Sequence, residues 1–386
     1  MIRGGPELAN GGLPWPKGPQ ALIVKAAIGP QDQVEASFRA WLEQVDIDAH
    51  LDGGTFRLLP LVYERLRAVG FTDPLMGRMK GVYRRAWAEN SALFNDVAST
   101  IGGLEASGVR TLLLKGAPLA FSYYANHATR PMSDLDVVIP SGQRERALEV
   151  LKNLGWTSVD WVPADELADQ HGLGFRNAAG REIDLNWHCL RETPSSAADA
   201  WFWADAQPFK FAGVATRQPS PTVMLLHLVL HGVRSNVEPP IRWVVDTATV
   251  VRTRGDEIDW ASLVAYAKSQ KLTHRLSLGL DFLAREYDVP IPAEVLRDLK
   301  ARRASLIERI ENLGYLGPAE FQYRPRIFPL VDYWRYLRTQ SPWAFVTGFP
   351  AYLRRRWRLR SLKQAPLEIL ATLRRRYART SAESRT

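Results

Sequence analysis

Asp134 and Asp136 are two acidic residues separated by one position, a pattern that can bind a cation. They lie in the run Arg-Pro-Met-Ser-Asp-Leu-Asp-Val-Val-Ile at residues 130–139, which is typical of a strand. Because side chains alternate along a strand, both carboxylates point to the same side. Two carboxylates held in this way can bind a divalent metal ion.

A second acidic run, Glu-Ile-Asp-Leu-Asn-Trp at residues 182–187, carries Asp184. If its strand neighbours the first, three carboxylates gather around one or two Mg²⁺ ions, which predicts nucleotide chemistry. An isolated Asp-x-Asp pair is often only a solvated strand end. The surrounding residues therefore determine whether the pair is interpreted as a binding site.

The residues around the pair favour a binding site. An apolar run at residues 109–114 predicts a buried strand that ends in Lys115-Gly116. Lys115 is a candidate phosphate ligand, Gly116 lets the backbone approach phosphate closely, and Arg130 can neutralise a leaving pyrophosphate. The alternatives are a solvated strand end for Lys115 and an ion pair with a nearby acid for Arg130.

The elements around these residues predict a compact α/β sheet. We expect strands at residues 109–114, 134–139, 156–159, 171–177 and 181–187, the last two joined in a hairpin by Ala178-Ala179-Gly180. A short helix should follow Pro118. An amphipathic helix should begin at Pro140-Ser141, with Ser141 as its N-cap, and stop at Gly155.

The rest of the chain is predicted to form helical regions and extensions. The predicted units are a flexible N-terminal segment (1–30), a helical region (31–107) broken at Gly53-Gly54, a catalytic core (108–192), a helical domain (193–320) and an aromatic and basic C-terminal extension (321–386). Within the helical domain, helices are expected at residues 221–233, 240–252, 260–269, 272–287 and 293–313.

Composition narrows the class of protein. The single cysteine, Cys189, excludes an intrachain disulfide and a cysteine-based zinc cluster, and we expect a small buried residue there. The N-terminus does not read as a signal peptide, and no run of about 20 apolar residues could span a bilayer. We therefore expect a cytoplasmic protein.

The net charge of +9 is carried by the tail. Residues 351–386 hold 11 Lys or Arg and 2 Asp or Glu, whereas residues 1–350 hold 39 of each sign. Arginines interleaved with aromatic residues suit RNA or an anionic membrane surface. A solvated tail that binds nothing specific is equally compatible.

Four motifs together resemble a known family: Leu114-Lys115-Gly116, residues 130–136, Ile183-Asp184-Leu185-Asn186-Trp187-His188, and Arg242-Trp243-Val244-Val245-Asp246. In order and spacing they are similar to uncharacterised bacterial nucleotidyltransferases of the superfamily that shares its catalytic core with DNA polymerase β. The resemblance extends over residues 31–313. It implies an α+β fold, a polymerase β-like core with a mixed sheet between two helical regions.

By this resemblance, Asp134 and Asp136 bind metal ions that bridge a triphosphate, and Asp184 joins the metal that activates the acceptor hydroxyl. Two Mg²⁺ ions are implied, with Mn²⁺ as a substitute, and ATP is the first choice of nucleoside triphosphate. Lys115, Gly116, Arg130, Ser133 and His231 complete the implied nucleotide site.

The chain departs from the pattern at two places. The wider superfamily usually carries Gly-Ser where this chain has Lys115-Gly116, a change that points to Lys115 as a phosphate ligand. Asn186 replaces a histidine that the branch often shows after the third acidic position, so acceptor deprotonation could fall to Asp184.

Other candidates have simpler interpretations. His227 and His231 lie four residues apart, a spacing that can suit zinc, but hydrogen-bonded histidines are the favoured interpretation. Asp246 sits in an apolar helix and needs a partner, for which Arg242 is the expected one. The aromatic run Trp201-Phe202-Trp203 is expected to pack one domain on another.

The functional prediction is transfer of a nucleoside monophosphate from a nucleoside triphosphate to a hydroxyl or phosphate of an unidentified small molecule, peptide or protein, with release of pyrophosphate. Alternatives are a toxin-like enzyme that acts on tRNA or other RNA, a kinase on the same fold, and a non-catalytic nucleotide-binding module. The intact acidic set argues against the last.

Overall fold

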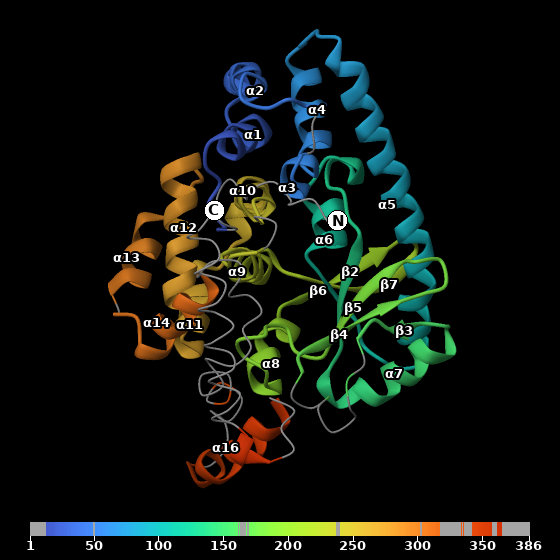
Figure 1. The fold of residues 1–386 in the computed structure, drawn as a ribbon, viewed down its shortest axis with the longest axis vertical. Coiled ribbons are helices and arrows are strands. Elements are labelled where there is room, and N and C mark those ends of the chain that lie inside the picture. Colours follow the sequence, from blue (N-terminus) through green and yellow to red (C-terminus); the bar gives the residue numbers. More distant parts are fainter. Residues whose placement is uncertain are drawn as a thin grey trace.

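A computed structural model describes residues 13–48, 51–160, 162, 167, 170–236, 240–301, 303–316, 333, 335, 342–356 and 361–364. Figure 1 shows a sheet beside the long helix α5 (Leu75–Ala106) and a group of helices, α9 to α14, on the opposite side. The predicted mixture of helices with a mixed sheet is confirmed.

The central sheet has five strands in the order β1-β2-β5-β4-β3. The strands are β1 (Leu112–Leu114), β2 (Asp134–Val138), β3 (Thr157–Ser158), β4 (Gly172–Arg176) and β5 (Glu182–Asn186). β2 and β5 are parallel, and the other neighbours are antiparallel. The predicted hairpin of β4 and β5 is confirmed, with Gly180 in its turn at φ +75°.

Alternation along β2 and β5 divides the sheet into two faces. Leu135, Val137, Ile183 and Leu185 are buried in one core with α5 and α7 (Arg144–Asn153). The carboxylates of the same strands are on the opposite face, since successive side chains alternate. The acidic face therefore lies toward α9 (Pro221–Gly232), whose His231 lines the same cavities.

Helices of the C-terminal half share a second core with helices near the N-terminus. The C-terminal group contains α10 (Arg242–Arg254), α11 (Trp260–Gln270), α12 (Thr273–Tyr287), α13 (Ala293–Ala301) and α14 (Leu306–Tyr315). The N-terminal group contains α1 (Pro19–Ile28), α2 (Val34–Leu42) and α4 (Leu59–Ala68). Trp15 joins them, because its ring contacts both Trp243 and Phe282.

Two glycines let α9, α10 and α12 approach closely. A Cβ on Gly232 would lie 2.1 Å from Cβ of Trp243, and one on Gly279 would lie 2.5 Å from Cγ1 of Val229. Both distances are below any normal contact between carbon atoms. The wall that faces the acidic strands is therefore closely packed.

Shorter elements complete the fold. They are η1 (Gln31–Gln33), α3 (Gly53–Phe56), α6 (Gly116–Ser122), η2 (His127–Thr129), η3 (Ser141–Gln143), α8 (Ser196–Ala204), η5 (Gly255–Glu257), α16 (Pro342–Arg356) and η7 (Leu362–Gln364). Among the residues that the structure describes, no helix is both long and apolar enough to cross a membrane.

The structure corrects several predicted elements. α1 lies within the segment predicted to be flexible. The region around Gly53-Gly54 is divided into separate helices as predicted, but the two glycines begin α3 instead of lying between helices. Ser141 opens η3, while α7 begins at Arg144 with Gln143 as its N-cap. The helix predicted at residues 293–313 is two helices, because Ser305 and Glu308 form a capping box that starts α14.

A second hairpin, β6 (Ala206–Phe211) with β7 (Val214–Pro219), lies within residues 193–320, where the sequence predicts a helical domain. Its turn places Ala212 at φ +45° and Gly213 at φ +90°, as a type I′ turn requires. Phe211 is buried in the core of the sheet, and Phe209 and Val214 pack against that core. The hairpin therefore belongs with the sheet and not with the helices that follow it.

Candidate functional site

The two acidic strands are neighbours. In the parallel pairing of β2 and β5, Asp136 lies opposite Asp184, and Asp134 lies opposite Glu182. Neighbouring strands are about 4.8 Å apart, so Asp136 and Asp184 project side by side from one face. Asp134, Asp136, Asp184 and Lys115, which we call the carboxylate cluster, all line one cavity.

Lys115 occupies a strained turn between β1 and α6. Its backbone has φ +48° and ψ −101°, a left-handed region that a residue with a Cβ rarely adopts. The turn directs Nζ to 2.7 Å from Oδ1 of Asp136 and 3.0 Å from Nε2 of His231. At Gly116 a Cβ would lie 2.8 Å from Sδ of Met132, so a larger residue there would require the Met132 side chain to move.

His231 lies on α9, across from the acidic strands. Its Nε2 is 2.8 Å from Nη2 of Arg234 as well as 3.0 Å from Nζ of Lys115. Burial, with Arg234 and Lys115 beside it, holds the pKa of His231 well below its usual value. A neutral ring whose Nε2 accepts from both cations follows from this environment.

Arg130 is held by an acid from a distant helix. Its Nε and Nη2 each donate to a carboxylate oxygen of Asp246 at 2.9 Å, and the hydroxyl of Tyr124 donates to the same carboxylate. The predicted pairing of Asp246 with Arg242 is wrong, because Arg242 donates to the carbonyl of Pro131 instead. The remaining Nη1 of Arg130 is buried and has no hydrogen-bond partner among the described residues.

Asn90 on α5 fixes the loop that carries Arg130. Its Nδ2 donates to the carbonyls of His127 and Arg130, and its Oδ1 accepts from the N–H of Met132 at 2.9 Å. Ser133, next along the loop, is exposed, and its hydroxyl lies 3.4 Å from Oδ1 of Asp134. Asn90 gave no signal in the sequence beyond a polar residue at a helical core position.

Two cavities meet at the carboxylate cluster. The first, of about 340 Å³, is lined by Arg57, Arg130, Arg234 and Arg242, and we call it the arginine cavity. The second, of about 250 Å³, is lined by His171, His188, His227 and His231, and we call it the histidine cavity.

The two cavities share a wall, formed by Lys115, Asp136, Asp184, His231 and Arg234. Among the described residues, the arginine cavity therefore combines five basic side chains with four carboxylates, whereas the histidine cavity combines four histidines with three basic and three acidic side chains. Burial lowers the pKa of His171 to about 4 and that of His227 to about 3, so both rings are neutral at pH 7.

The carboxylates repel one another. Burial, together with the charges of Asp136 and Asp134, raises the pKa of Asp184 to about 6. Burial also raises the pKa of Asp136, against the lowering effect of Lys115. Oxygen donors that repel each other suit Mg²⁺ or Mn²⁺ chemically. In the described part of the chain, however, no three acidic, histidine or cysteine side chains are already gathered as a metal site, and Lys115 contacts Asp136.

The zinc interpretation of His227 and His231 gains no support. Their rings stack with centroids 5.9 Å apart, and Nε2 of His231 is occupied by the contacts to Lys115 and Arg234. Nδ1 of His227 is buried without a hydrogen-bond partner in the part of the chain that is described. It belongs to a side chain that lines the histidine cavity.

His188 and Asp199 form a hydrogen-bonded pair that the sequence analysis did not select. Nδ1 of His188 lies 2.6 Å from Oδ2 of Asp199, while Oδ1 of Asp199 accepts from the N–H of Cys189 at 2.8 Å. The signal was present, because residues 184, 186 and 188 alternate with buried neighbours. Cys189 is buried as expected, and burial raises its pKa well above the usual value.

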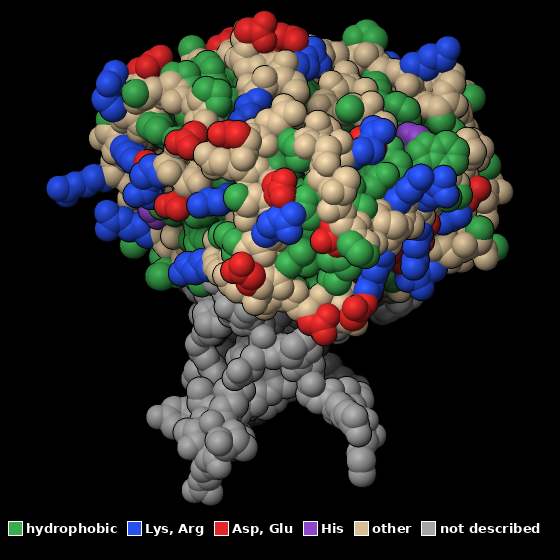
Figure 2. All heavy atoms as spheres, turned by 90° about the horizontal axis from the view of Figure 1, so that it is seen from above, with side chains coloured by type: hydrophobic (Ala, Val, Ile, Leu, Met, Phe, Trp, Pro, Cys, Tyr) green, Lys and Arg blue, Asp and Glu red, His purple; other side chains and the backbone are tan. Residues whose placement is uncertain are grey.

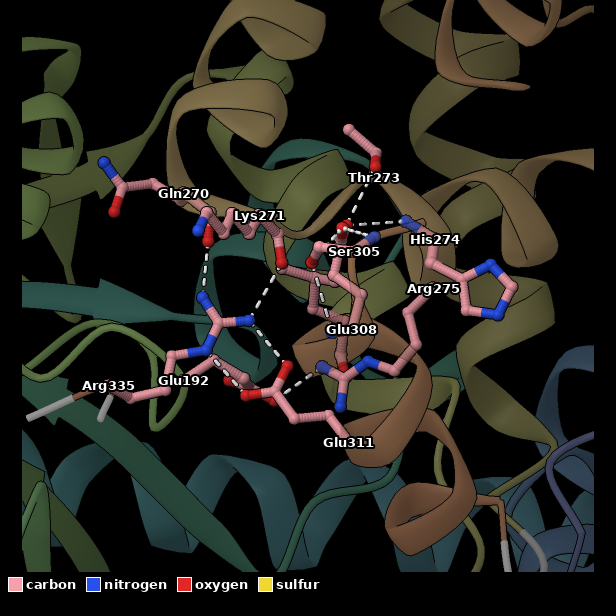
Figure 3. A network of polar contacts seen from close by, with 11 residues as sticks. Glu192, Gln270, Lys271, Thr273, His274, Arg275, Ser305, Glu308, Glu311 and Arg335 are labelled. Atoms are coloured by element: carbon pink, nitrogen blue, oxygen red, sulfur yellow. Dashed lines mark hydrogen bonds and ion pairs between the residues drawn. The ribbon is translucent and has the colours of Figure 1, made fainter. Parts of the chain in front are cut away.

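A second buried group of charges lies beside the histidine cavity (Figure 3). Arg275 donates to Glu192 and to the carbonyl of Leu230, and Arg335 donates twice to Glu311 and also to the carbonyl of Lys271. Although burial alone would raise it, Arg275 lowers the pKa of Glu192 to about 2. We call Glu192, Arg275, Glu311 and Arg335 the ion-pair network.

The remaining predictions concern surfaces. Trp201 stacks on Tyr266 with ring centroids 4.1 Å apart, a contact within the predicted helical domain, and Phe202 is fully buried. Trp203 contacts the predicted core, because the guanidinium of Arg110 lies 4.9 Å from its ring centroid. Figure 2 shows basic and acidic side chains interspersed over the face that is drawn, in line with the balanced charge of residues 1–350. Most of the basic tail, residues 351–386, lies outside the described residues.

Comparison with known proteins gives a family match. A family model described as an uncharacterised nucleotidyltransferase matches residues 55–288. No curated protein matches the chain. Among solved structures, the chain is similar to an antigenic nucleotidyltransferase-like protein from Paracoccidioides brasiliensis, with 15% identity over 55% of this chain and 94% of that one, at a TM-score of 0.31.

Proposed function

The chain belongs to a family of uncharacterised nucleotidyltransferases, and from this premise we propose that it transfers a nucleoside monophosphate to an acceptor and releases pyrophosphate. The donor is a nucleoside triphosphate, ATP first among them, and the acceptor offers a hydroxyl or a phosphate. The reaction depends on Mg²⁺, which Mn²⁺ can replace. The core, by this proposal, is of the polymerase β type.

One observation carries the proposal: Asp136 and Asp184 lie opposite each other where a cavity that contains four arginines meets a second cavity. Transfer at an α-phosphorus requires positive charge to balance the leaving pyrophosphate on one side of the phosphorus atom. It also requires the acceptor to be held on the opposite side. Two cavities joined at carboxylates supply both compartments. This arrangement favours an enzyme over a module that only binds nucleotide.

Each residue has a role that follows from its surroundings. Asp134, Asp136 and Asp184 hold the metal ions, which when bound polarise the reacting phosphate and acceptor oxygen. In the arginine cavity, the free Nη1 of Arg130 can donate to a phosphate oxygen while Asp246 fixes the rest of the guanidinium. Lys115, Ser133 and His231 add donors at the shared wall, and Gly116 admits the phosphates closely.

The test is label transfer from α-labelled and γ-labelled ATP, with Mg²⁺, into protein, RNA and small-molecule fractions of a lysate. Transfer of α-label should fall by at least about 10³-fold, or roughly 4 kcal/mol, in Asp134→Asn/Asp136→Asn. Asp96→Asn is the matched control, because Asp96 forms an exposed ion pair with Arg181 on another face.

Each outcome assigns a reaction. Metal-dependent transfer of α-label that the double variant loses supports the proposal, and the labelled fraction names the acceptor class. Transfer of γ-label alone identifies a kinase and rejects nucleotidyl transfer. Nucleotide binding without transfer of either label, in every fraction, identifies a binding module.

A further inference from the structure

The histidine cavity contains an imidazole that is oriented by a carboxylate. His188 follows the end of β5 at Asn186 and lines the same cavity as Asp136 and Asp184. Its side chain is 11% exposed and that of Asp199 is 6% exposed. The pair is therefore largely shielded from bulk water, with His188 lining the cavity.

Asp199 fixes which nitrogen of His188 carries a proton. Oδ1 of Asp199 accepts from the N–H of Cys189, and Oδ2 lies 2.6 Å from Nδ1 of His188. A carboxylate in this position accepts the hydrogen of Nδ1, so Nε2 keeps its lone pair. This is the arrangement by which a protein holds an imidazole ready to accept a proton.

A second feature of the cavity also indicates a ligand. Nδ1 of His227 is buried and unpartnered among the described residues, although leaving a buried polar atom unsatisfied is unfavourable. A hydroxyl group in the cavity would satisfy it. The cavity volume of about 250 Å³ corresponds to about eight water-sized groups at roughly 30 Å³ each, which is the size of a monosaccharide or small polyol.

We propose that the histidine cavity binds the acceptor of the reaction, a compact hydroxyl-bearing molecule, and that His188 accepts the proton of the attacking hydroxyl while Asp199 positions the ring. This inference rests on the proposed function. The acceptor oxygen forms a bond to the α-phosphorus of the nucleoside triphosphate, and the bond from that phosphorus to the bridging oxygen breaks. Pyrophosphate leaves with the bonding electron pair.

The proton of the hydroxyl passes to Nε2, which gives an imidazolium that the carboxylate of Asp199 stabilises. The histidine then returns the proton to solvent. An acceptor phosphate would bring no such proton, so the pair favours a hydroxyl over a phosphate as the attacking group. Asp184, as a metal ligand, then need not act as the base.

The test uses the full chain, α-labelled ATP, Mg²⁺, and as acceptors a mixture of monosaccharides and polyols with the small-molecule fraction of a lysate. We expect His188→Gln to lower transfer by about 10²–10⁴-fold. Affinity for an ATP analogue with a methylene between the α and β phosphorus atoms, measured by calorimetry, should change less than about twofold. His274→Gln is the matched control, because His274 lies on α12 outside both cavities.

Two more variants separate a catalytic role from a structural one. In Asp199→Asn the amide can donate to Nδ1, which moves the ring hydrogen to Nε2 and should abolish transfer with little change in shape. Added imidazole should restore part of the activity of His188→Ala and none of that of Asp199→Asn. A structural role would not give this difference.

Transfer by His188→Gln within about threefold of the unmodified protein overturns the inference and leaves the proposed function intact. Loss of analogue binding in His188→Gln also overturns it, because His188 would then serve the nucleotide. If imidazole does not restore His188→Ala, or if only phosphate groups accept label, the base role is rejected. Absence of α-label transfer by the unmodified protein rejects the proposed function and this role together.

Discussion

The carboxylate cluster and the ion-pair network are both groups of charged side chains shielded from solvent. They shift the pKa of a carboxyl group in opposite directions. In the network, Arg275 contacts Glu192 and lowers its pKa to about 2. In the cluster, burial and two neighbouring carboxylates raise the pKa of Asp184 to about 6. The two pKa values differ because Arg275 outweighs the effect of burial on Glu192, whereas the neighbouring carboxylates add to the effect of burial on Asp184.

This difference separates a structural from a reactive use of charge. The network joins α12, α14 and the chain around Glu192 through ion pairs made within the protein, although Nη1 of Arg275 has no hydrogen-bond partner among the described residues. In the cluster the carboxylates repel one another, and a bound cation would reduce this repulsion. Residues that are unfavourable for stability in this way are typical of sites selected for function.

The largest expected effect is on activity in the cluster. Asp184→Asn should lower α-label transfer by at least about 10³-fold because a metal ligand is lost. The same variant should unfold at an equal or higher temperature at pH 8, since repulsion among the carboxylates is reduced. Calorimetry alongside the transfer assay checks both, and a large fall in stability would contradict the comparison.

Breaking the network should mainly lower the stability of the protein, in contrast to the loss of activity expected for the cluster. Arg275→Met leaves Glu192 buried without its cation, and we expect a loss of about 3–5 kcal/mol in the free energy of unfolding. Arg39→Met is the control, because its exposed pair with Glu35 on α2 is worth only about 0.3–0.5 kcal/mol. Urea unfolding measures both, and a double variant with Glu192→Gln should recover part of the loss.

Acid should weaken the network. Glu192 has a folded pKa of about 2, below its ordinary value of 4.5, so its contribution is present above pH 4.5 and is lost as the pH falls toward 2. The shift corresponds to about 3 kcal/mol. Urea unfolding from pH 6 to pH 2.5 should show this loss in the unmodified protein, and a flat profile would show that Glu192 is not held as described.

The smallest effect is the reverse pH dependence of the cluster. Asp184 has a folded pKa raised from 3.8 to about 6, so its stabilising contribution is full below pH 3.8 and is lost as the pH rises through 6. Allowing for solvent screening, we expect about 1–2 kcal/mol. Asp184→Asn should thus gain stability over the unmodified protein at pH 8, and the gain should vanish near pH 3.5.

The strands that carry the carboxylates could be predicted because alternation is a local property. Residues 134–139 and 181–187 show it plainly, and β2 and β5 lie there. Their pairing is not local, and the sequence pattern alone left it as a condition, to which the family resemblance gave a reason. The hairpin of β6 and β7 was missed because Pro208 and Pro219 interrupt a weak alternation, although Gly213 marked its turn.

The partners within the site depended on geometry that the sequence does not contain. Arg242 is one helical turn from Asp246 and was the obvious partner, but Arg130, 116 residues away, makes the bidentate contact. The left-handed backbone of Lys115 likewise follows from packing around Gly116 and not from propensity. The base proposed here, His188, was hidden because its orienting Asp199 lies on a later helix.

The parallel pairing of β2 with β5 also affects how the protein is made. Asp134 and Asp136 leave the ribosome well before Asp184, and at roughly 5–20 residues per second the delay is several seconds. During that interval β2 has an open edge, the kind of strand that invites association with other chains. Charged side chains on an open edge oppose such association. The aspartates thus oppose association of the nascent strand with other chains before Asp184 is available to form the site with them.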